Sequence, residues 1–386
     1  MSHTRLPWSR LLLLASVCCL AMISELLPSS FIQEMASDFQ VELGSMSLFI
    51  GCYAIMSALI GIPLTRVFSH VNRKHYLMAV CLAYSLSNLA IGLASNFIFA
   101  FAARLVAGAV AGALWAMIAS YPIRFLPEEV AGRGTAIVLA GVTVGLSLGL
   151  PLATSLAKML DWRAGFFLVA GLYAAVTVIG YFGFPSVAGE AYTAENNYSQ
   201  LLKDHGTRVV CVLTLLLVGA QYLSYIFIQL LAEHNLMSVN TVQFAFGIGA
   251  LASIGIVARV IDRHLIRLGL SIMGISIIAL LLISGANLAP WSQGLAYLGF
   301  ILWGLSFTPV TTVLQTLATR RTQTGKSLAN SLNATCYDLA IMLSSLLGSF
   351  LIQRTGLLAV TGSSIVLIIC ALILLFHSRH YWSSPS

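Results

Sequence analysis

Three ionisable side chains lie inside long apolar runs of the sequence: Glu25, Arg104 and Asp338. No charged residue occurs in the fourteen positions from Leu11 to Ser24, immediately before Glu25. A charge in hydrocarbon costs at least about 2.5 kcal/mol, and such residues usually face a cavity or a partner. All three are therefore candidates for binding a proton or a charged solute, with static hydrogen bonding between helices as the alternative.

Glu25 and Arg104 are expected at a similar depth in a membrane. Glu25 follows Arg10 by fifteen residues, which is about 22 Å along a helix at about 1.5 Å per residue. Arg104 follows Asn96 by eight residues, about 12 Å from the opposite end. In a hydrocarbon core about 30 Å thick the two can share one network. A guanidinium group keeps its proton, so it lowers the pKa of the acid while it is close, and this effect disappears when it moves away. A permanent salt bridge that only fixes packing is the alternative.

A proline follows Glu25 by three residues. Because Pro28 has no N–H, it frees the main-chain carbonyl of Ser24 and favours a kink there. A carboxylate beside an uncapped carbonyl suits a proton or a cation.

Asp338 lies twelve residues beyond Lys326, about 18 Å along a helix. The predicted helix that contains Asp338 is the most polar one of the second half. Ser331, Thr335, Asp338 and Ser345 share one of its faces, and Asn330, Asn333 and Tyr337 lie beside that face. The pattern indicates a preference for a cationic or hydroxyl-rich ligand, or else a protonated, hydrogen-bonded acid with a structural part only.

Other polar and aromatic side chains occupy mid-helix positions and are candidates for contacting a ligand. With Asn330, Asn333 and Tyr337, this set comprises Trp115, Gln221, Tyr222, Tyr225, Trp303 and Phe307. Aromatic rings beside amides suit flat or ring-bearing solutes, although each of them singly is more often helix packing.

The composition requires a lipid environment for these helices. The chain has 386 residues, 59% of them hydrophobic and 9% charged, with a mean hydropathy of +0.92, whereas a soluble domain carries about 25% charged residues. Twelve helical spans are predicted, because barrel strands would be shorter and alternate with period two. They are 10–32, 44–66, 76–95, 98–121, 134–157, 164–184, 209–231, 240–260, 268–287, 293–316, 327–351 and 357–376.

The distribution of Lys and Arg predicts the orientation. With both termini cytoplasmic, sixteen basic residues lie on the cytoplasmic side and three, Lys158, Arg163 and Arg354, on the other. This asymmetry explains the net charge of +7 without a nucleic-acid partner. The longest polar stretch, 185–207, follows the sixth span, so we expect six-helix bundles at 1–184 and 209–386, a cytoplasmic linker at 185–208, and a site near the midplane.

Several motifs resemble the major facilitator superfamily. "FAARLVAGAVAG" (101–112) matches its fourth-helix motif, "GIPLTRVFSHVNRK" (61–74) lies at its signature loop, and "GVTVGLSLGLP" (141–151) resembles the glycine-rich fifth-helix motif of its proton-driven exporters. With "SELLP", "DWRAGFF" and "WGLSFTPV", the chain is similar to the drug and sugar efflux branch, including arabinose-efflux-like and purine-nucleoside-efflux permeases. The resemblance implies an all-α membrane protein with twelve transmembrane helices in two six-helix bundles.

The resemblance also implies gating and structural roles. The residues in the corresponding positions are Gly61, Arg66, Arg73, Lys74, Gly108, Gly141, Gly145, Gly149, Asp262 and Arg263. The signature loop departs from the family, since Thr65 and Asn72 stand where acids are usual, so that Asp262 and Arg263 are candidates to carry part of that role. The glycine stripe at 141, 145 and 149 predicts close helix contact, which in the exporter family is with a helix of the other half.

The main hypothesis is that the chain is a multi-pass inner-membrane exporter, which exchanges protons for a small organic solute by alternating access. Glu25 is the expected proton carrier, Arg104 its modulator and Asp338 a second site. A sugar or nucleoside uniporter or proton symporter is one alternative, and a transport-incompetent sensor or scaffold is another. No P-loop, metal-spaced His or Cys set, or nucleophile elbow occurs. We therefore expect no enzyme, no cofactor besides the proton, no nucleic acid, and a monomer whose partners are its solute and the lipid bilayer.

Overall fold

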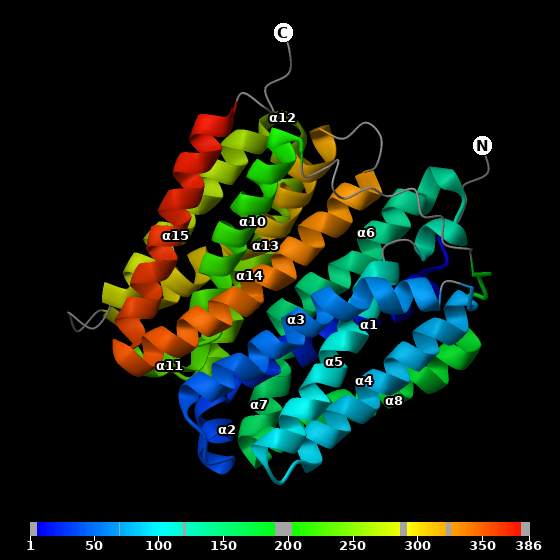
Figure 1. Ribbon diagram of the computed structural model, residues 1–386, viewed down its shortest axis with the longest axis horizontal. Helices are drawn as coiled ribbons and strands as arrows, with labels where there is room; N and C mark the ends of the chain where they lie inside the picture. The colour runs from blue at the N-terminus through cyan, green and yellow to red at the C-terminus, as the bar shows by residue number, and fades with distance from the viewer. Residues whose placement is uncertain are drawn as a thin grey trace. The chain divides into compact units, whose positions relative to one another are not determined.

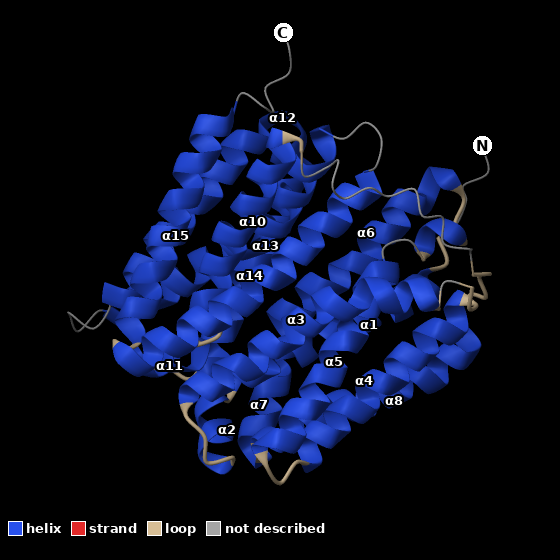
Figure 2. Ribbon diagram, viewed as in Figure 1, coloured by secondary structure: helices blue, strands red, loops and turns tan. Residues whose placement is uncertain are grey.

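The computed structural model describes residues 6–68, 70–118, 121–189, 203–285, 292–321 and 326–379. Regular structure within these ranges is entirely helical (Figures 1 and 2). Twelve helices among the described residues are long and apolar enough to cross a membrane, from Trp8–Ser30 to Leu357–Ser378. The prediction of an all-α membrane protein with twelve spans is confirmed.

The chain divides into two compact units, Met1–Val41 with Cys52–Ala194, and Glu42–Gly51 with Glu195–Ser386. The bundle limits predicted from the sequence, 1–184 and 209–386, stay a prediction.

The helices up to residue 183 are α1 (Trp8–Leu26), α2 (Ile32–Asp38), α3 (Leu43–Val67), α4 (Arg73–Leu93), α5 (Phe97–Ile118), α6 (Glu128–Val144), α7 (Leu150–Leu160) and α8 (Trp162–Gly183). Short turns join them: the 3₁₀ turns η1 (Leu27–Ser30) and η2 (Pro122–Arg124), and the π-helical turn η3 (Gly145–Gly149). The later helices are α10 (His205–Tyr225), α11 (Ile228–His234), α12 (Val239–Gly285), α13 (Ser292–Arg321), α14 (Lys326–Arg354) and α15 (Leu357–Ser378).

Three of the predicted spans are interrupted by local breaks. The first changes from α-helix to 3₁₀ geometry around Pro28, as its missing N–H predicts. The fifth contains the π-helical turn η3, directly before Pro151, which likewise removes a main-chain donor. The seventh ends at Tyr225, and α11 begins after Phe227, whose backbone is not helical. The eighth and ninth spans run together in α12, with a break in the helical backbone at His264.

Polar side chains fix several helix starts at the membrane surface. Asn72 accepts a hydrogen bond from the N–H of Lys74 at the start of α4, and Asp161 accepts one from Arg163 at the start of α8. These caps satisfy donors that the first turn of a helix leaves without partners. They also fix the points at which the chain turns back into the bilayer.

Within the first unit, α1 packs against α6 and α8, and α4 packs between α5 and α8 (Figure 1). This arrangement places α1, which carries Glu25, close to the rest of the polar core described below. Within the second unit, α12 packs along α13, while α10 contacts α14 and α15 (Figure 1). Helices α10 and α13 also pack together, and Tyr222 and Tyr225 of α10 contact Phe307 and Trp303 of α13.

Candidate functional site

The side chain of Arg104 is completely buried in the first unit. Its Nη1 donates a hydrogen bond to the main-chain carbonyl of Ser24 at 2.7 Å, and its Nη2 donates one to the carbonyl of Glu25 at 2.6 Å. The Ser24 carbonyl is the one that Pro28 leaves without an intrahelical donor. The structure thus places Arg104 against the C-terminal end of α1, which carries Glu25, through two buried main-chain carbonyls.

The guanidinium group also lies over an aromatic ring. Its Cζ is 4.3 Å from the ring centroid of Tyr53 on α3, a cation–π contact that is stronger when desolvated. The hydroxyl of Tyr53 is 2.9 Å from that of Tyr84, and the ring of Tyr84 stacks on Tyr173 with centroids 4.6 Å apart. Helices α3, α4, α5 and α8 therefore each contribute one side chain to this buried group.

A second set of hydrogen bonds joins α1 to α4. Ser24 Oγ donates to Asn88 Oδ1 at 3.1 Å, and Asn88 Nδ2 donates to the carbonyl of Tyr84 at 2.9 Å. We call Ser24, Glu25, Tyr53, Tyr84, Asn88, Arg104 and Tyr173 the Arg104 network. All seven side chains are buried.

Glu25 is 8% exposed, and the guanidinium group that binds its main-chain carbonyl can interact electrostatically with its carboxyl group. In a medium of low dielectric constant such interactions are much stronger than in water. A proton bound to Glu25 would cancel one of the few charges in this network.

The second unit holds a chain of neutral hydrogen bonds. Trp303 Nε1 donates to Gln221 Oε1 at 2.6 Å, Gln221 Nε2 donates to Ser276 Oγ at 2.8 Å, and Ser276 Oγ donates to Ser306 Oγ at 2.8 Å. Gln221 and Trp303, both candidate ligand contacts, thus bind each other and link α10, α12 and α13.

An aromatic cluster surrounds this chain. It comprises Tyr222, Tyr225, Phe246, Trp303, Phe307 and Tyr337, with neighbouring ring centroids 5.3 to 6.3 Å apart. The hydroxyl of Tyr337 donates to that of Tyr222 at 3.3 Å. The hydroxyl of Tyr225 is buried and has no hydrogen-bond partner among the described residues. Buried hydroxyl groups are normally satisfied, so this one is an exception in the cluster.

The remaining ligand-binding candidates divide by environment. Asp338 is half-buried on α14, next to Tyr337. Asn333 is 3% exposed and accepts a hydrogen bond from Thr214 Oγ1 at 2.6 Å, so its amide oxygen is engaged with α10. Trp115 is half-buried on α5, the helix of Arg104. The side chain of Asn330 lies outside the described residues.

The predicted gating residues of the first unit lie at the end of the bundle where α4 begins. Arg73 donates its main-chain N–H to the carbonyl of Val187 at 2.8 Å, and Lys74 Nζ is 5.3 Å from the ring centroid of Tyr181. In α12, Arg263 is exposed beside the break at His264. The side chains of Gly61, Arg66 and Asp262 lie outside the described residues.

The predicted glycines mark close backbone approaches. A Cβ atom at Gly108 would overlap the carbonyl of Tyr53, and one at Gly141 or Gly145 would overlap a carbonyl of α1; at Gly149 it would meet Ile23 of α1. The stripe therefore packs on α1 of the same unit, whereas the resemblance implied a helix of the other half. Gly108 matters for the site itself, because it lets α5 approach the backbone of Tyr53 one turn from Arg104.

Sequence reasoning missed the partners of the predicted residues. In the first unit these are Tyr53, Tyr84, Asn88 and Tyr173. Spacing could have signalled one pair, since Tyr84 and Asn88 lie four residues apart on one helical face. In the second unit it missed Ser276, Ser306 and Phe246, which carry no such pattern.

Comparison with known proteins identifies the class. Residues 13–327 match the Major Facilitator Superfamily model, and the chain belongs to this family of membrane transporters. It is 27% identical over 99% of its length to a chloramphenicol efflux pump of Mycobacterium tuberculosis, of which it covers 96%. It is 22% identical to a probable sugar efflux transporter of Helicobacter pylori, covering 86% of each chain. It is 23% identical to a purine ribonucleoside efflux pump of Escherichia coli, covering 92% of this chain and 90% of the other.

Among solved structures, the fold is similar to a bacterial homologue of the human lysosomal transporter Spinster. The TM-score is 0.75 at 15% identity, with 97% of this chain and 98% of the other covered. The family and the fold are those of transporters, which confirms the resemblance predicted from the sequence motifs.

Proposed function

We propose that this transporter exports a small organic solute in exchange for protons, by alternating access, with Glu25 as the proton carrier. The observation that carries this proposal is the burial of Arg104 against the carbonyls of Ser24 and Glu25. A guanidinium group held there keeps a neighbouring carboxylate ionised, and a shift of α1 away from it favours protonation. Proton binding and helix position thereby become one equilibrium.

The Arg104 network would transmit this change to other helices. Tyr53 contacts Arg104 through its ring and Tyr84 through its hydroxyl, so α3 and α4 respond to any movement of the guanidinium group. Arg104 is in this proposal the modulator of the proton site, not the carrier itself.

The aromatic cluster of the second unit is proposed as the solute-binding region. It offers rings for stacking and the unpartnered hydroxyl of Tyr225 as a hydrogen-bonding group. Asp338 on the neighbouring helix would add attraction for a positive charge. The relatives named for efflux of chloramphenicol, sugars and purine ribonucleosides support solutes with rings, hydroxyl groups or both.

We further propose that the chain functions as a monomer in the cytoplasmic membrane, with both termini on the cytoplasmic side, as its basic residues predict. The decisive experiment uses purified protein in vesicles that contain a pH-sensitive dye. Chloramphenicol, a purine ribonucleoside, a sugar and a cationic dye are supplied in turn. Proton movement opposite to the solute supports antiport, movement in the same direction indicates symport, and solute flux without protons indicates a uniporter. Correct folding without flux of any solute would indicate a sensor or scaffold.

A further inference from the structure

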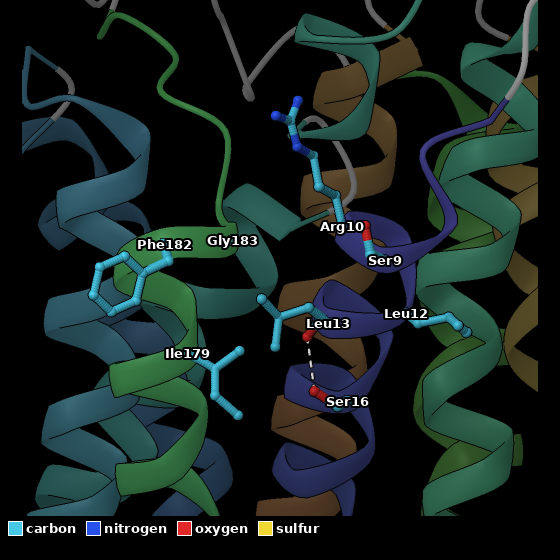
Figure 3. A pocket seen from close by; sticks show the side chains of 8 residues that line it. All are labelled: Ser9, Arg10, Leu12, Leu13, Ser16, Ile179, Phe182 and Gly183. Atoms are coloured by element: carbon cyan, nitrogen blue, oxygen red, sulfur yellow. Dashed lines mark hydrogen bonds between the residues drawn. The ribbon is translucent and has the colours of Figure 1, made fainter.

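A groove with a volume of about 500 Å³ lies between α1 and α8 of the first unit, and none of its lining residues belongs to the Arg104 network. Its lining residues are Ser9, Arg10, Leu12, Leu13 and Ser16 of α1, and Ile179, Phe182 and Gly183 of α8. In Figure 3, Leu13 and Ile179 point toward one another between the two helices, while Arg10 extends past the N-terminal end of α1.

The groove opens toward the lipid. The side chains of Phe182, Leu12 and Ile179 are 83%, 57% and 55% exposed, and a membrane helix exposes such groups to hydrocarbon. Its inner wall contributes little polarity, because Ser16 Oγ donates its hydrogen bond to the carbonyl of Leu13 at 2.8 Å (Figure 3). Gly183 allows the side chain of Leu13 to approach α8, since a Cβ atom there would lie 2.8 Å from a methyl group of Leu13.

The mouth of the groove carries positive charge. Arg10 is exposed, and it makes no ion pair with any described residue.

Other cations gather around the last turn of α8 and the segment after it. Lys74 lies 5.3 Å from the ring centroid of Tyr181, the residue before Phe182. Arg124 donates a hydrogen bond to the carbonyl of Ala188 at 3.2 Å. Arg10 therefore lines the mouth itself, while Lys74 and Arg124 lie at the same end of α8.

We propose that this groove binds one anionic phospholipid, with the headgroup phosphate on Arg10 and one acyl chain along Leu13, Ile179 and Phe182. By the predicted topology this end faces the cytoplasm, where anionic lipids give the membrane surface a negative potential. A long arginine stem reaches the headgroup level while its guanidinium group stays at the interface. Basic pockets between membrane helices on this side are suited to anionic headgroups.

The test uses the full chain, stripped of lipid in detergent and incubated with phosphatidylglycerol or phosphatidylethanolamine. Native mass spectrometry measures the fraction that retains one lipid. We expect preferential retention of phosphatidylglycerol. Arg10→Gln should lower this retention about fivefold, the equivalent of about 1 kcal/mol for one basic side chain at an anionic surface, whereas Arg10→Lys should largely preserve it.

Two further variants separate headgroup and acyl-chain contacts. Ser16→Phe fills the inner end of the groove without changing any charge and should also lower retention. Arg208→Gln removes the same charge from α10, which does not line the groove, and should leave retention unchanged. Equal retention of the two lipids, or equal losses in Arg10→Gln and Arg208→Gln, would overturn the proposal. Retention unaffected by Ser16→Phe would also overturn it, because the acyl chain would then lie elsewhere.

Discussion

Arg104 Nη2 donates a hydrogen bond of 2.6 Å to the main-chain carbonyl of Glu25. The contact joins the middle of α5 to the end of α1, at the turn where Pro28 interrupts the helical hydrogen bonds. A main-chain carbonyl accepts this bond in either protonation state of Glu25, so the bond orients the guanidinium group while α1 and α5 are in contact. In the proposed mechanism the two helices separate when the acid is protonated, which breaks the bond.

The first prediction concerns the shape of the base. Arg104→Lys keeps the charge, but one ammonium group cannot bind the carbonyls of Ser24 and Glu25 as the planar guanidinium does while lying over Tyr53. A buried acceptor left without a donor costs about 1–3 kcal/mol. We expect a lower midpoint of thermal unfolding in detergent and impaired proton-coupled efflux.

Arg208→Lys is the matched control, because Arg208 is exposed in the first turn of α10. Surface substitutions usually change stability by less than about 0.5 kcal/mol, so its unfolding midpoint should stay close to that of the parent. A similar midpoint for both variants would show that the bidentate geometry of Arg104 does not matter.

The second prediction concerns Glu25 as the proton carrier. Glu25→Gln keeps the size and hydrogen-bonding capacity of the side chain but removes its titration. Efflux driven by a pH gradient across vesicles should fall to background, while exchange of labelled solute against unlabelled solute remains measurable.

Glu34→Gln makes the same chemical change on the exposed side of α2 and should behave as the parent does. Gradient-driven efflux at the parental rate in Glu25→Gln would remove Glu25 from the mechanism.

The relation between Glu25 and Arg104 shows what sequence alone can predict. The span count follows from runs of about 20 apolar residues, and the depth of each charge follows from the fixed rise of a helix. The kink at Pro28 follows from a missing donor. Each of these properties depends on the residue's own segment.

The missed features depend on which helices are neighbours. Tyr53 becomes a partner of Arg104 because Gly108 allows α3 and α5 to approach, and Trp303 donates to Gln221 because α10 and α13 are adjacent. The break at His264 replaces an expected loop, since only tertiary packing decides how sharply two spans join. Contacts of this kind can be identified only once it is known which helices are neighbours in the folded protein.

The third prediction concerns the contact between α12 and α13. A Cβ atom at Gly304 would overlap the carbonyl of Phe246, and one at Gly249 would overlap that of Ile301. Overpacking a tight interface costs about 1–3 kcal/mol, so Gly304→Ala and Gly249→Ala should each lower the unfolding midpoint.

Gly255→Ala on α12 is the control, because nothing lies within 4 Å of its added methyl group. Alanine favours a helix over glycine by about 1 kcal/mol, so this variant should be unchanged or slightly stabilised. If all three alanine variants behaved alike, the close approach of the two helices would be refuted.

The fourth prediction concerns orientation. The excess of Lys and Arg predicts that both termini and the 185–207 segment face the cytoplasm. A reporter that is active only in the cytoplasm should work when fused after Ser386 or inserted within 185–207, and fail when inserted at Asp161, between α7 and α8. The reverse pattern would invert the topology and place the lipid groove in the other leaflet.

The fifth prediction concerns Asp338 and the charge of the solute. Asp338 is half-buried on α14 beside Tyr337, whose hydroxyl reaches Tyr222 in the aromatic cluster. A carboxylate at this place would attract a cationic solute, whereas an amide of the same shape would not. Asp338→Asn should fold and insert normally, because the amide preserves most hydrogen bonds of a neutral acid.

Transport of a cationic dye by Asp338→Asn should fall at least about fivefold, the equivalent of about 1 kcal/mol for a charge pair at 4 Å even in water-like surroundings. Transport of a neutral nucleoside should change little, and the ratio of the two rates is the quantity to measure. Equal losses for both solutes would mean that Asp338 acts on the conformational cycle and does not contact the solute's charge. Unchanged rates for both would reduce it to a packing residue of α14.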